Sequence, residues 1–409
     1  MKRMGRWLFM IALAAALLCV PALAAAPTFT DSDRIENSGA VGMLCDLGII
    51  SGYGDGSFQP NGTVSRQAAA KMVALMLTDS PRASGTVRFS DVADDSQFAQ
   101  AIYFCAGRGI LSGSGGAFRP NEPVTARALA KMLLGALGYD TSGYVGAGWA
   151  DRVDADARAI GIYDGFYDYY DQPITRDNAC LLMFNALSCC AVRGYDADGQ
   201  PQYYLDELMN PQTLLEYRYG VVRYSELLIA NEYANLTEAD GRLDAGYSQL
   251  EHHRALAVST GLEMLGRNVV LYAKDGRVVG VPTYSPYEGY YTFENFFDLA
   301  QVLSRVGMTI GDGTKFYYNY NESDRLAMVR TGDNAEITIV DHTGDGVIDL
   351  VLVVECREAA VVSAEDGEIL AQFDEGDPFP VVMTDGSVPE AGDSVKAAWI
   401  GGRWLAKMK

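Results

Sequence analysis

Hydrophobic positions recur at helical spacing in the first half of the chain and in short runs in the second half. Met72, Val73, Met76 and Leu77 fall at i, i+1, i+4 and i+5, which places them on one face of a helix. The segment that leads into this helix returns further along the chain, where 118–132 resembles 58–72. Other short motifs recur at the same offset, and such a fixed period predicts repeated supersecondary units.

Each repeat opens with an aromatic residue, then any residue, then Asp, at 29–31, 89–91 and 149–151. In the first two repeats we expect a helix next, then a Gly-rich turn, a Phe-x-Pro-Asn segment and a second helix. The hydroxyl of Ser65 or Thr125 can cap the second helix by accepting a hydrogen bond from a first-turn N–H. In the third repeat the segment 149–161 is much shorter than its counterpart 89–109, which predicts a short first helix.

Beyond about residue 215 the pattern changes to strands. Short runs rich in β-branched and aromatic residues occur at 219–225, 268–273, 278–281, 315–318, 335–340 and 347–354. The Asp275-Gly276 pair between two of these runs is a strong hairpin signal. The segment 294–306 is the best helix candidate here. Three further Gly-containing turns interrupt the last fifty residues, and such even spacing predicts small barrels or sandwiches.

The sequence therefore predicts a multidomain α + β protein, with an all-α first half and a mostly-β second half. We expect a signal peptide at 1–26, repeats at 27–85, 86–146 and 147–190, and a polar linker at 191–214. A β-rich domain at 215–290, an α/β-hairpin domain at 291–358 and a small β domain at 359–409 are expected to follow.

The N-terminus has the three regions of an export signal. Lys2, Arg3 and Arg6 precede an apolar run at 7–20, and A-x-A cleavage sites follow at 22–24 and 24–26. Cys19 leaves a lipoprotein open as an alternative. Because no other stretch approaches 18 apolar residues, we expect no transmembrane segment after cleavage.

The formal net charge is −21, with an isoelectric point near 4.5. A basic footprint is needed to bind phosphates, so this charge argues against a nucleic acid as partner. It also means that an anionic polymer would be held by local Arg geometry. Six cysteines remain beyond Cys19, and an even number in an exported chain permits disulfides. Buried free thiols are favoured, because Cys45, Cys105 and Cys180 lie in apolar helical contexts.

The repeats resemble the S-layer homology (SLH) repeat of bacterial surface proteins. The resemblance rests on Leu-Gly-Ile-x-x-Gly-x-x-Asp-Gly-x-Phe-x-Pro, here 47–60, and on the following Val-Ser-Arg or Ile-Thr-Arg. It covers about 29–190, and it implies three helix pairs packed as a pseudo-threefold spindle with grooves between the repeats. It also implies a ligand, a secondary polysaccharide attached to peptidoglycan and often acidic.

Family members use the opening Asp and the Arg of a Thr-Arg-Ala-Glu motif. The resemblance therefore implies binding roles for Asp31, Asp91, Asp151, Arg66 and Arg176, since a guanidinium forks onto a carboxylate and an Asp accepts sugar hydroxyls. This sequence departs from the motif at several positions. The second repeat has Ala126 at the Arg position, so Arg127, one place late, is the candidate for binding there, and the Glu is replaced by Ala68, Ala128 and Asn178. The alternatives are a solvated first-turn Arg and an Asp that caps the next helix.

One further motif approximates a calcium loop. Asp341, Thr343, Asp345, the Val347 carbonyl and Asp349 fit positions 1, 3, 5, 7 and 9 of an EF-hand loop, but position 12 is Leu352 instead of Glu. We expect no cofactor other than a weakly bound calcium ion at this turn. The alternative is an Asp/Gly-rich hairpin turn.

No nucleophile elbow, zinc-protease, P-loop or dinucleotide fingerprint occurs. The region after the repeats also resembles uncharacterised parts of SLH-containing proteins from Gram-positive anaerobes. We therefore expect a secreted cell-wall protein without catalytic activity. Its second half would form an S-layer-like structural module, with self-association, or a display module. The alternatives are an SLH-anchored glycan hydrolase, or an adhesin with its site in 215–409.

Overall fold

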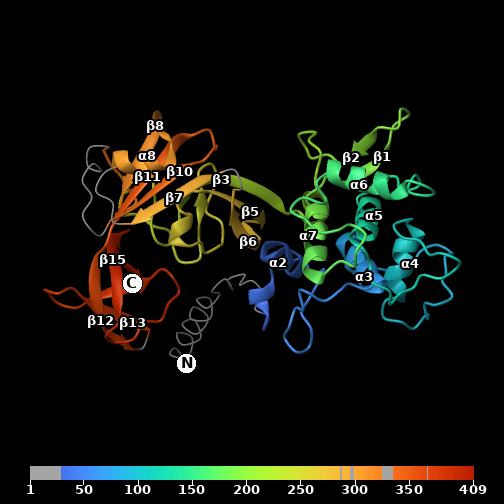
Figure 1. The fold of residues 1–409 in the computed structure, drawn as a ribbon, viewed down its shortest axis with the longest axis horizontal. Helices are drawn as coiled ribbons and strands as arrows, with labels where there is room; N and C mark the ends of the chain where they lie inside the picture. The colour runs from blue at the N-terminus through green and yellow to red at the C-terminus, as the bar shows by residue number, and fades with distance from the viewer. Residues whose placement is uncertain (1–28, 286–287, 295–298, 325–334, 366) are drawn as a thin grey trace, which may run out of the picture. The chain divides into compact units, whose positions relative to one another are not determined.

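The computed structural model describes residues 29–285, 288–294, 299–324, 335–365 and 367–409 (Figure 1). The chain divides into a helical unit, residues 25–222 with 279–281, and a β unit, residues 223–278 and 282–409. This division confirms the predicted α + β organisation. The predicted signal peptide lies outside the described residues. Within the described ranges, no helix is long and apolar enough to cross a membrane.

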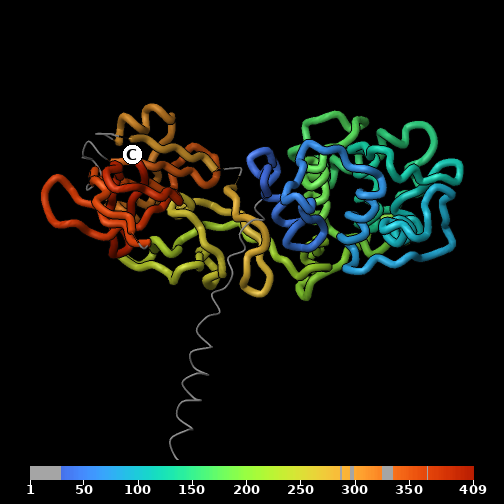
Figure 2. The backbone as a smooth tube through the Cα atoms, turned by 90° about the horizontal axis from the view of Figure 1, so that it is seen from below, coloured from blue at the N-terminus to red at the C-terminus, as the bar shows by residue number. Residues whose placement is uncertain are grey.

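The helical unit follows the predicted repeats, and its course runs from blue to green in Figures 1 and 2. The first helix of each repeat packs against the second helix of another: α4 on α3, α6 on α5 and α2 on α7. Each helix pair thus joins two different repeats. The elements are η1 (Ser32–Arg34), α2 (Ser38–Asp46), α3 (Arg66–Leu77), α4 (Ala99–Gly107), α5 (Ala126–Ala136), α6 (Trp149–Ala159) and α7 (Arg176–Leu187).

Three backbone hydrogen bonds link the repeats in a closed cycle. The Val64 N–H donates to the Ile174 carbonyl at 3.1 Å, the Ile174 N–H to the Val124 carbonyl at 3.0 Å, and the Val124 N–H to the Val64 carbonyl at 2.8 Å. All three side chains are buried. Because each residue lies two positions before the second helix of its repeat, the cycle fixes where α3, α5 and α7 begin.

Glycine allows the opening aromatic residue of the first two repeats to pack closely. A Cβ atom on Gly52 would lie 2.7 Å from the Phe29 ring, and one on Gly113 would lie 2.6 Å from the Phe89 ring. Phe29 and Phe89 in turn contact the rings of Phe58 and Phe118, with centroids 5.2 and 5.4 Å apart. The Phe-x-Pro segment is thus pinned to the start of its own repeat.

The third repeat corrects one prediction. Its first helix, α6, has 11 residues, whereas α2 and α4 have 9 each, so it is not short. The shorter spacing arises because Trp149 and Asp151 already lie inside α6, while Phe29 and Phe89 precede a turn. The repeat has lost its opening turn and not its helix.

Residues 191–214, predicted as a linker, belong to the helical unit. They contain the hairpin of β1 (Val192–Tyr195) and β2 (Pro201–Tyr203), and a π-helix, η2 (Leu215–Tyr219), follows. The Val192 N–H donates to the Leu137 carbonyl, and Arg218 forms an ion pair with Asp79 at 2.6 Å. These bonds tie the segment to α3 and to the end of α5.

The β unit begins with a four-stranded sheet in the order β4-β3-β5-β6, formed by β3 (Val222–Ala230), β4 (Gln249–Leu250), β5 (Asn268–Lys274) and β6 (Arg277–Tyr284). The predicted hairpin is confirmed, since Asp275 and Gly276 connect neighbouring strands and both have positive φ angles, 51° and 77°. A short 3-10 helix, η3 (Leu262–Met264), precedes β5.

A five-stranded sheet follows in the order β7-β10-β11-β8-β9. It comprises β7 (Gly289–Glu294), β8 (Thr309–Tyr318), β9 (Asn321–Glu322), β10 (Ala335–Asp341) and β11 (Val347–Glu355), with β11 parallel to β8. The predicted helix at 294–306 is described only from Leu299, where α8 (Leu299–Val306) begins, and residues 295–298 lie outside the described part. Leu299 and Val302 pack on Ile337, Ile339 and Val351 of the sheet.

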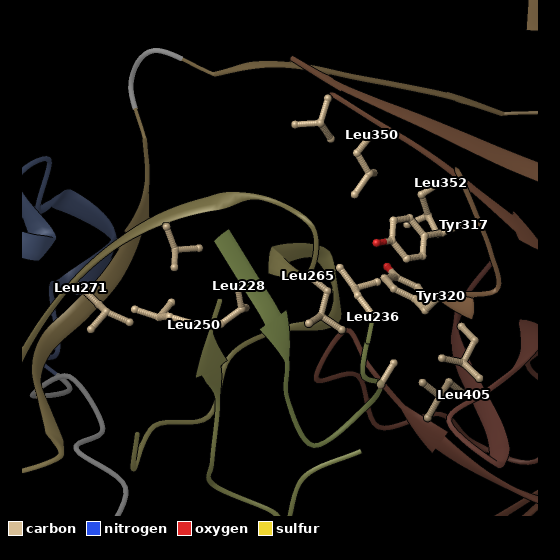
Figure 3. Close-up of a cluster of buried hydrophobic side chains, with 14 of the residues drawn as sticks. Leu228, Leu236, Leu250, Leu265, Leu271, Tyr317, Tyr320, Leu350, Leu352 and Leu405 are labelled. Carbon is tan, nitrogen blue, oxygen red and sulfur yellow. The ribbon is translucent and has the colours of Figure 1, made fainter. Parts of the chain in front are cut away.

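The last strands close into a small barrel in the order β12-β13-β14-β16-β15, formed by β12 (Arg357–Glu365), β13 (Glu368–Gln372), β14 (Phe379–Met383), β15 (Ser394–Ile400) and β16 (Arg403–Met408). This agrees with the small barrels that the turn spacing predicts. One apolar cluster joins both sheets to the barrel. Figure 3 shows Leu228 and Leu265 lying between Leu250 on one side and Tyr317, Leu352 and Leu405 on the other.

Candidate functional site

The opening Asp of the first two repeats locks a turn. Both oxygens of Asp31 accept backbone N–H groups, from Phe58 at 2.8 Å and from Gln59 at 2.9 Å. Asp91 does the same for Phe118 at 2.8 Å and Arg119 at 2.7 Å. Gln59 and Arg119 have φ angles of 58° and 62°, a region that costs energy for a residue with a Cβ. Each carboxylate therefore stabilises a strained turn about 27 residues later, in the middle of its own repeat.

These bonds set the charge state of the two carboxylates. The backbone hydrogen bond from Phe58 is the main cause that lowers the pKa of Asp31, and the bond from Phe118 does the same for Asp91. Both groups are ionised at neutral pH. Sequence reasoning singled out both residues as candidates for sugar binding and offered a cap of the next helix as the alternative. The structure shows a long-range cap of the Phe-x-Pro turn, and η1 has no side-chain cap from Asp31.

Arg66 lies at the first position of α3 and reaches the second repeat. Its Nε donates to the Phe118 carbonyl at 2.9 Å and its Nη2 to the Ser112 carbonyl at 3.3 Å. The guanidinium carbon lies 4.7 Å from the centre of the Phe118 ring. Burial lowers the pKa of Arg66, but an Arg guanidinium stays charged in proteins. The group is thus a fixed positive charge at the junction of the first and second repeats.

Arg176 occupies the matching position in α7 and reaches the first repeat. Its Nη2 donates to the Ser51 carbonyl at 2.7 Å, and its guanidinium lies over the rings of Tyr53 and Phe58 at 4.9 and 4.7 Å. Its Nε is buried and has no hydrogen-bond partner among the described residues. Arg66 and Arg176 therefore have similar surroundings at two different junctions between repeats. Each donates through Nη2 to a Ser carbonyl, lies over the ring of a Phe-x-Pro motif and has donors that remain to be used.

The junction of the second and third repeats is built differently. Ala126 stands at the position of Arg66 and Arg176 and is buried. Arg127, one residue later, makes a bidentate pair with Asp154, with Nε at 3.0 Å from both oxygens and Nη2 at 2.7 Å from Oδ2. The bond with Asp154 raises the pKa of Arg127. Tyr163 donates to the same carboxylate at 3.1 Å. In this structure Arg127 thus links the start of α5 to α6.

Asp151 also departs from its counterparts. It lies in the first turn of α6 and is exposed, and the structure gives its side chain no hydrogen bond or ion pair with any described residue. The structure brings Asp31 and Asp91 to equivalent places, and likewise Arg66 and Arg176. Asp151 and Arg127 fall outside both sets. Sequence reasoning missed the rings under the guanidinium groups, although Tyr53 in the Gly-rich turn was a visible signal.

The predicted calcium turn lies between β10 and β11. Asp341 is almost fully buried, and its oxygens accept N–H groups from Thr343, Gly344, Asp345 and Gly346. Asp349 accepts the His342 N–H at 2.7 Å. Among the described residues, no group of three His, Cys, Asp or Glu side chains is placed to hold a metal ion. The hydrogen bonds fit the alternative, an Asp/Gly-rich turn, and calcium binding by Asp341, Thr343, Asp345, Val347 and Asp349 stays a prediction.

The sequence profile of the S-layer homology domain matches residues 28–70 and 88–125. The first part of this chain is thus similar to the S-layer homology (SLH) domain of bacterial surface proteins. The two matched segments lie within the first and second predicted repeats. The profile does not extend to the third, although α6 and α7 take part in the same packing and in the same cycle of backbone bonds.

Several known proteins are similar to parts of this chain. The surface-layer 125 kDa protein of Lysinibacillus sphaericus is 33% identical over 144 residues, which cover 34% of this chain and 12% of the relative. The cell surface protein of Thermoanaerobacter kivui is 24% identical over 332 residues, 78% of this chain and 41% of the relative. Exoglucanase XynX of Acetivibrio thermocellus is 28% identical over 151 residues, 34% and 14%.

The chain spans well under half the length of each of these relatives. The match to the SLH domain and the surface-layer relatives confirm the predicted location: the protein is secreted and lies at the cell wall or S-layer surface. The match to the exoglucanase covers only 34% of this chain, so it does not assign a role to the β unit.

Proposed function

We propose that this protein attaches non-covalently to a secondary polysaccharide linked to peptidoglycan, through grooves between its SLH repeats. SLH domains in general bind cell-wall polysaccharide, which supports the proposal. The observation that favours these particular grooves is the matched placement of Arg66 and Arg176. Each guanidinium is fixed on one side by carbonyls of the next repeat and rests on an aromatic ring.

The cycle of backbone bonds supports a pseudo-threefold arrangement of the repeats. Three equivalent segments exchange bonds through Val64, Val124 and Ile174, and each first helix packs on a second helix of another repeat. We infer that the three junctions are the three grooves of the spindle. Two of them hold the motif Arg on an aromatic ring. At the third, Ala126 takes the place of that Arg, and Arg158 of α6 lies over the Tyr170 ring instead.

The proposed ligand bears carboxylates. A guanidinium that is already oriented loses little freedom when it binds a planar anion, and such charge-assisted bonds are stronger than neutral ones. The net charge of −21 repels an anionic polymer at long range. Binding is therefore proposed to depend on contact with Arg66 and Arg176, and salt would weaken it only moderately. Asp31 and Asp91 act indirectly, because they stabilise the turns that contain Phe58 and Phe118, whose rings contact the two guanidinium groups.

The β unit is proposed to be an S-layer-like structural module or a display module, without catalytic activity. It has a cleft of about 540 Å³, lined in part by Glu336, Asp385 and Lys407. Glu336 binds Lys407, and Asp385 accepts N–H groups from Ser387 and Met408. Glu263 also lines the cleft, so two of its three carboxylates, Glu336 and Asp385, are already engaged, which disfavours the acid and base pair of a glycan hydrolase. Self-association of this unit remains part of the proposal.

The test is co-sedimentation of the chain from residue 27 with Gram-positive wall sacculi, before and after acid stripping of the secondary polymer. We expect pelleting that disappears with the polymer. Arg66→Ala and Arg176→Ala should each lower the affinity about tenfold or more, since a hydrogen bond to a charged group contributes roughly 1.5–3 kcal/mol. Arg193→Ala, an exposed Arg away from both junctions, is the matched control.

Arg66→Lys separates charge from geometry, because Lys keeps the charge but not the planar fork. It should recover only part of the affinity. Melting temperatures of all variants must be measured beside the wild type, because both Arg residues also bond the neighbouring repeat. Equal pelleting of the wild type and both folded Ala variants would exclude these grooves as the anchor. No pelleting of the wild type with intact walls would exclude anchoring itself.

A further inference from the structure

The junction of the second and third repeats contains a guanidinium that the SLH motif does not predict. Arg158 lies in the last turn of α6 and is exposed. Its guanidinium carbon lies 5.0 Å from the centre of the Tyr170 ring, and its Nε donates to the Tyr170 hydroxyl at 3.3 Å. The structure gives its two Nη groups no hydrogen bond with any described residue. Both terminal nitrogens can therefore donate to a ligand.

Contacts of both its backbone and its ring place Tyr170 at this junction. The Tyr170 carbonyl accepts the Arg127 N–H at 2.8 Å. The Tyr170 ring stacks on Tyr163, with centroids 4.2 Å apart. The Tyr163 hydroxyl donates at 3.1 Å to Asp154, the carboxylate that pairs with the Arg127 side chain. Tyr170 is thus linked twice to the start of α5, and Arg158 lies on its ring.

The other two junctions have the same backbone bond. There the carbonyls of Pro120 and Pro60 accept an N–H at 3.0 Å from the second residue of α3 and of α7, as Tyr170 does from the second residue of α5. The Phe of the same Phe-x-Pro segment lies 4.7 Å from the motif Arg. At all three junctions a guanidinium therefore rests on a ring of the loop that bonds the second helix. What differs at the third is the source of the guanidinium, which is α6.

The position of Arg158 has no Arg in the other two repeats. Arg158 lies three residues before Gly161, which matches Gly48 and Gly109, and all three glycines have positive φ angles. Three residues before those glycines stand Cys45 and Ala106. The third repeat thus has an additional Arg at the junction where the second repeat lacks the motif Arg.

The carboxylate nearest in effect to Arg158 does not occupy it. Asp154 is a carboxylate whose charge acts on Arg158, but its oxygens already accept bonds from Arg127 and Tyr163. Arg158 also differs from Arg66, which is half-buried. An exposed charge is screened by salt and contributes less to binding than a desolvated one. Arg158 should therefore contribute less affinity than Arg66.

We propose that Arg158 is a third carboxylate-binding residue, which replaces the missing motif Arg at the junction of the second and third repeats. Its two Nη groups donate to a carboxylate of the wall polymer, while the ring and the hydroxyl of Tyr170 orient the side chain. This inference rests on the proposed function. The polymer is then bound at all three junctions, through two half-buried guanidinium groups and one exposed one.

The test compares native wall sacculi with sacculi whose carboxyl groups have been reduced to alcohols by carbodiimide and borohydride. Arg158→Ala, in the chain from residue 27, should lower the affinity for native walls about two- to fivefold, the range of an exposed ion pair. It should bind reduced walls as the wild type does. In the Arg66→Ala/Arg176→Ala background, adding Arg158→Ala should remove the remaining difference in affinity between native and reduced walls.

Salt gives a second measurement, which a purely structural role of Arg158 would not affect. The loss of affinity caused by Arg158→Ala should be clear at about 50 mM NaCl and should vanish at about 500 mM, because an exposed charge is screened. The losses caused by Arg66→Ala and Arg176→Ala should persist at the higher salt concentration, since both side chains are half-buried.

Arg88→Ala is the matched control. Arg88 is also exposed and lies on a tyrosine, 4.7 Å from the centre of the Tyr103 ring, but its described contacts are with its own repeat. This variant should bind native walls as the wild type does. Arg158→Lys keeps the charge but not the planar fork, so it should recover only part of the affinity. Melting temperatures check that the variants fold, and Arg158→Gln replaces Arg158→Ala if the latter does not.

The outcomes separate this inference from the proposed function. If Arg66→Ala and Arg176→Ala weaken binding to native walls but Arg158→Ala does not, wall anchoring stands and the role of Arg158 is overturned. An equal loss of affinity of Arg158→Ala for native and reduced walls also overturns it, because the partner would then not be a carboxylate. If the wild type does not bind native walls, the proposed function fails, and this inference fails with it.

Discussion

At the scale of single residues, the motif positions have two kinds of role. Asp31 and Asp91 use both carboxylate oxygens on backbone N–H groups of their own repeat. Arg66 and Arg176 use part of their donors on carbonyls and leave the rest available. The resemblance of the sequence motifs implies a ligand-binding role for all four residues. The structure separates those that build the turn from those that face the junction.

We expect Asp91→Ala to lower the melting temperature of the helical unit at pH 7, because it leaves the Phe118 and Arg119 N–H groups without their acceptor. Asp151→Ala is the matched control and should have little effect. The folded state lowers the pKa of Asp91 below its usual 3.8. Its stabilisation is therefore complete above about pH 4 and is lost as the pH falls through the lowered pKa. Thermal unfolding of both variants and the wild type from pH 2 to pH 7 checks this, and an effect of Asp91→Ala that does not shrink as the pH falls below about 4 would contradict it.

The roles of these residues could be predicted only in part. The sequence identifies Asp31, Asp91, Arg66 and Arg176, because they recur at a fixed spacing. It does not reveal that Asp31 contacts Phe58, since that contact depends on how one repeat folds back on itself. The pairing of Arg127 with Asp154 is equally hidden, because it joins two repeats whose relative placement no local pattern specifies.

At the scale of elements, the second helices begin with the same cap. Ser65, Thr125 and Thr175 each accept an N–H three residues later, from Ala68, Ala128 and Asn178, at 3.3, 3.1 and 3.2 Å. The caps at Ser65 and Thr125 were predicted from sequence and are confirmed. A cap is predictable because it involves neighbouring residues only.

Thr125→Ala should therefore destabilise the helical unit by about 1 kcal/mol, the usual cost of losing an N-cap. Thr125→Ser keeps the hydroxyl and should cost much less. Urea unfolding followed by circular dichroism at 222 nm measures both changes. Equal losses in the two variants would show that the methyl group of Thr125, and not its hydroxyl, is what matters.

The strands were also largely predictable, because turn signals and β-branched runs are local. The runs at 268–273, 335–340 and 347–354 fall within β5, β10 and β11. Their pairing was not predictable. The parallel contact of β11 with β8 joins strands that are well separated in sequence, and α8 lies in the connection before β8. The length of α6 was predicted wrongly, because spacing between motifs does not show whether Trp149 lies inside a helix or before one.

At the scale of the whole molecule, the six cysteines of the described chain are all free thiols. This agrees with the interpretation favoured from sequence. Burial raises the pKa of Cys105 and Cys189 to about 12, and of Cys45 and Cys356 to about 11. At neutral pH these groups are protonated and serve as small apolar side chains.

Labelling the chain from residue 27 with a thiol reagent at pH 8 should accordingly be slow in the folded state and reach all six thiols in urea. Cys45 and Cys190 are partly exposed and should react first. Mass spectrometry of the unreduced chain gives the independent measurement. A loss of about 2 Da relative to the reduced chain would reveal a disulfide and contradict the prediction, because each disulfide removes two hydrogens.

The closed cycle of Val64, Val124 and Ile174 also bears on how a secreted chain folds. The bond from Val64 to Ile174 joins the first repeat to the third, so it forms only after a large loop has closed, and such long-range contacts slow folding. A chain that leaves the cell N-terminus first cannot complete the cycle until its third repeat has emerged. The bonds from Val64 and Val124 to Ile174 therefore form last, after the third repeat has left the membrane.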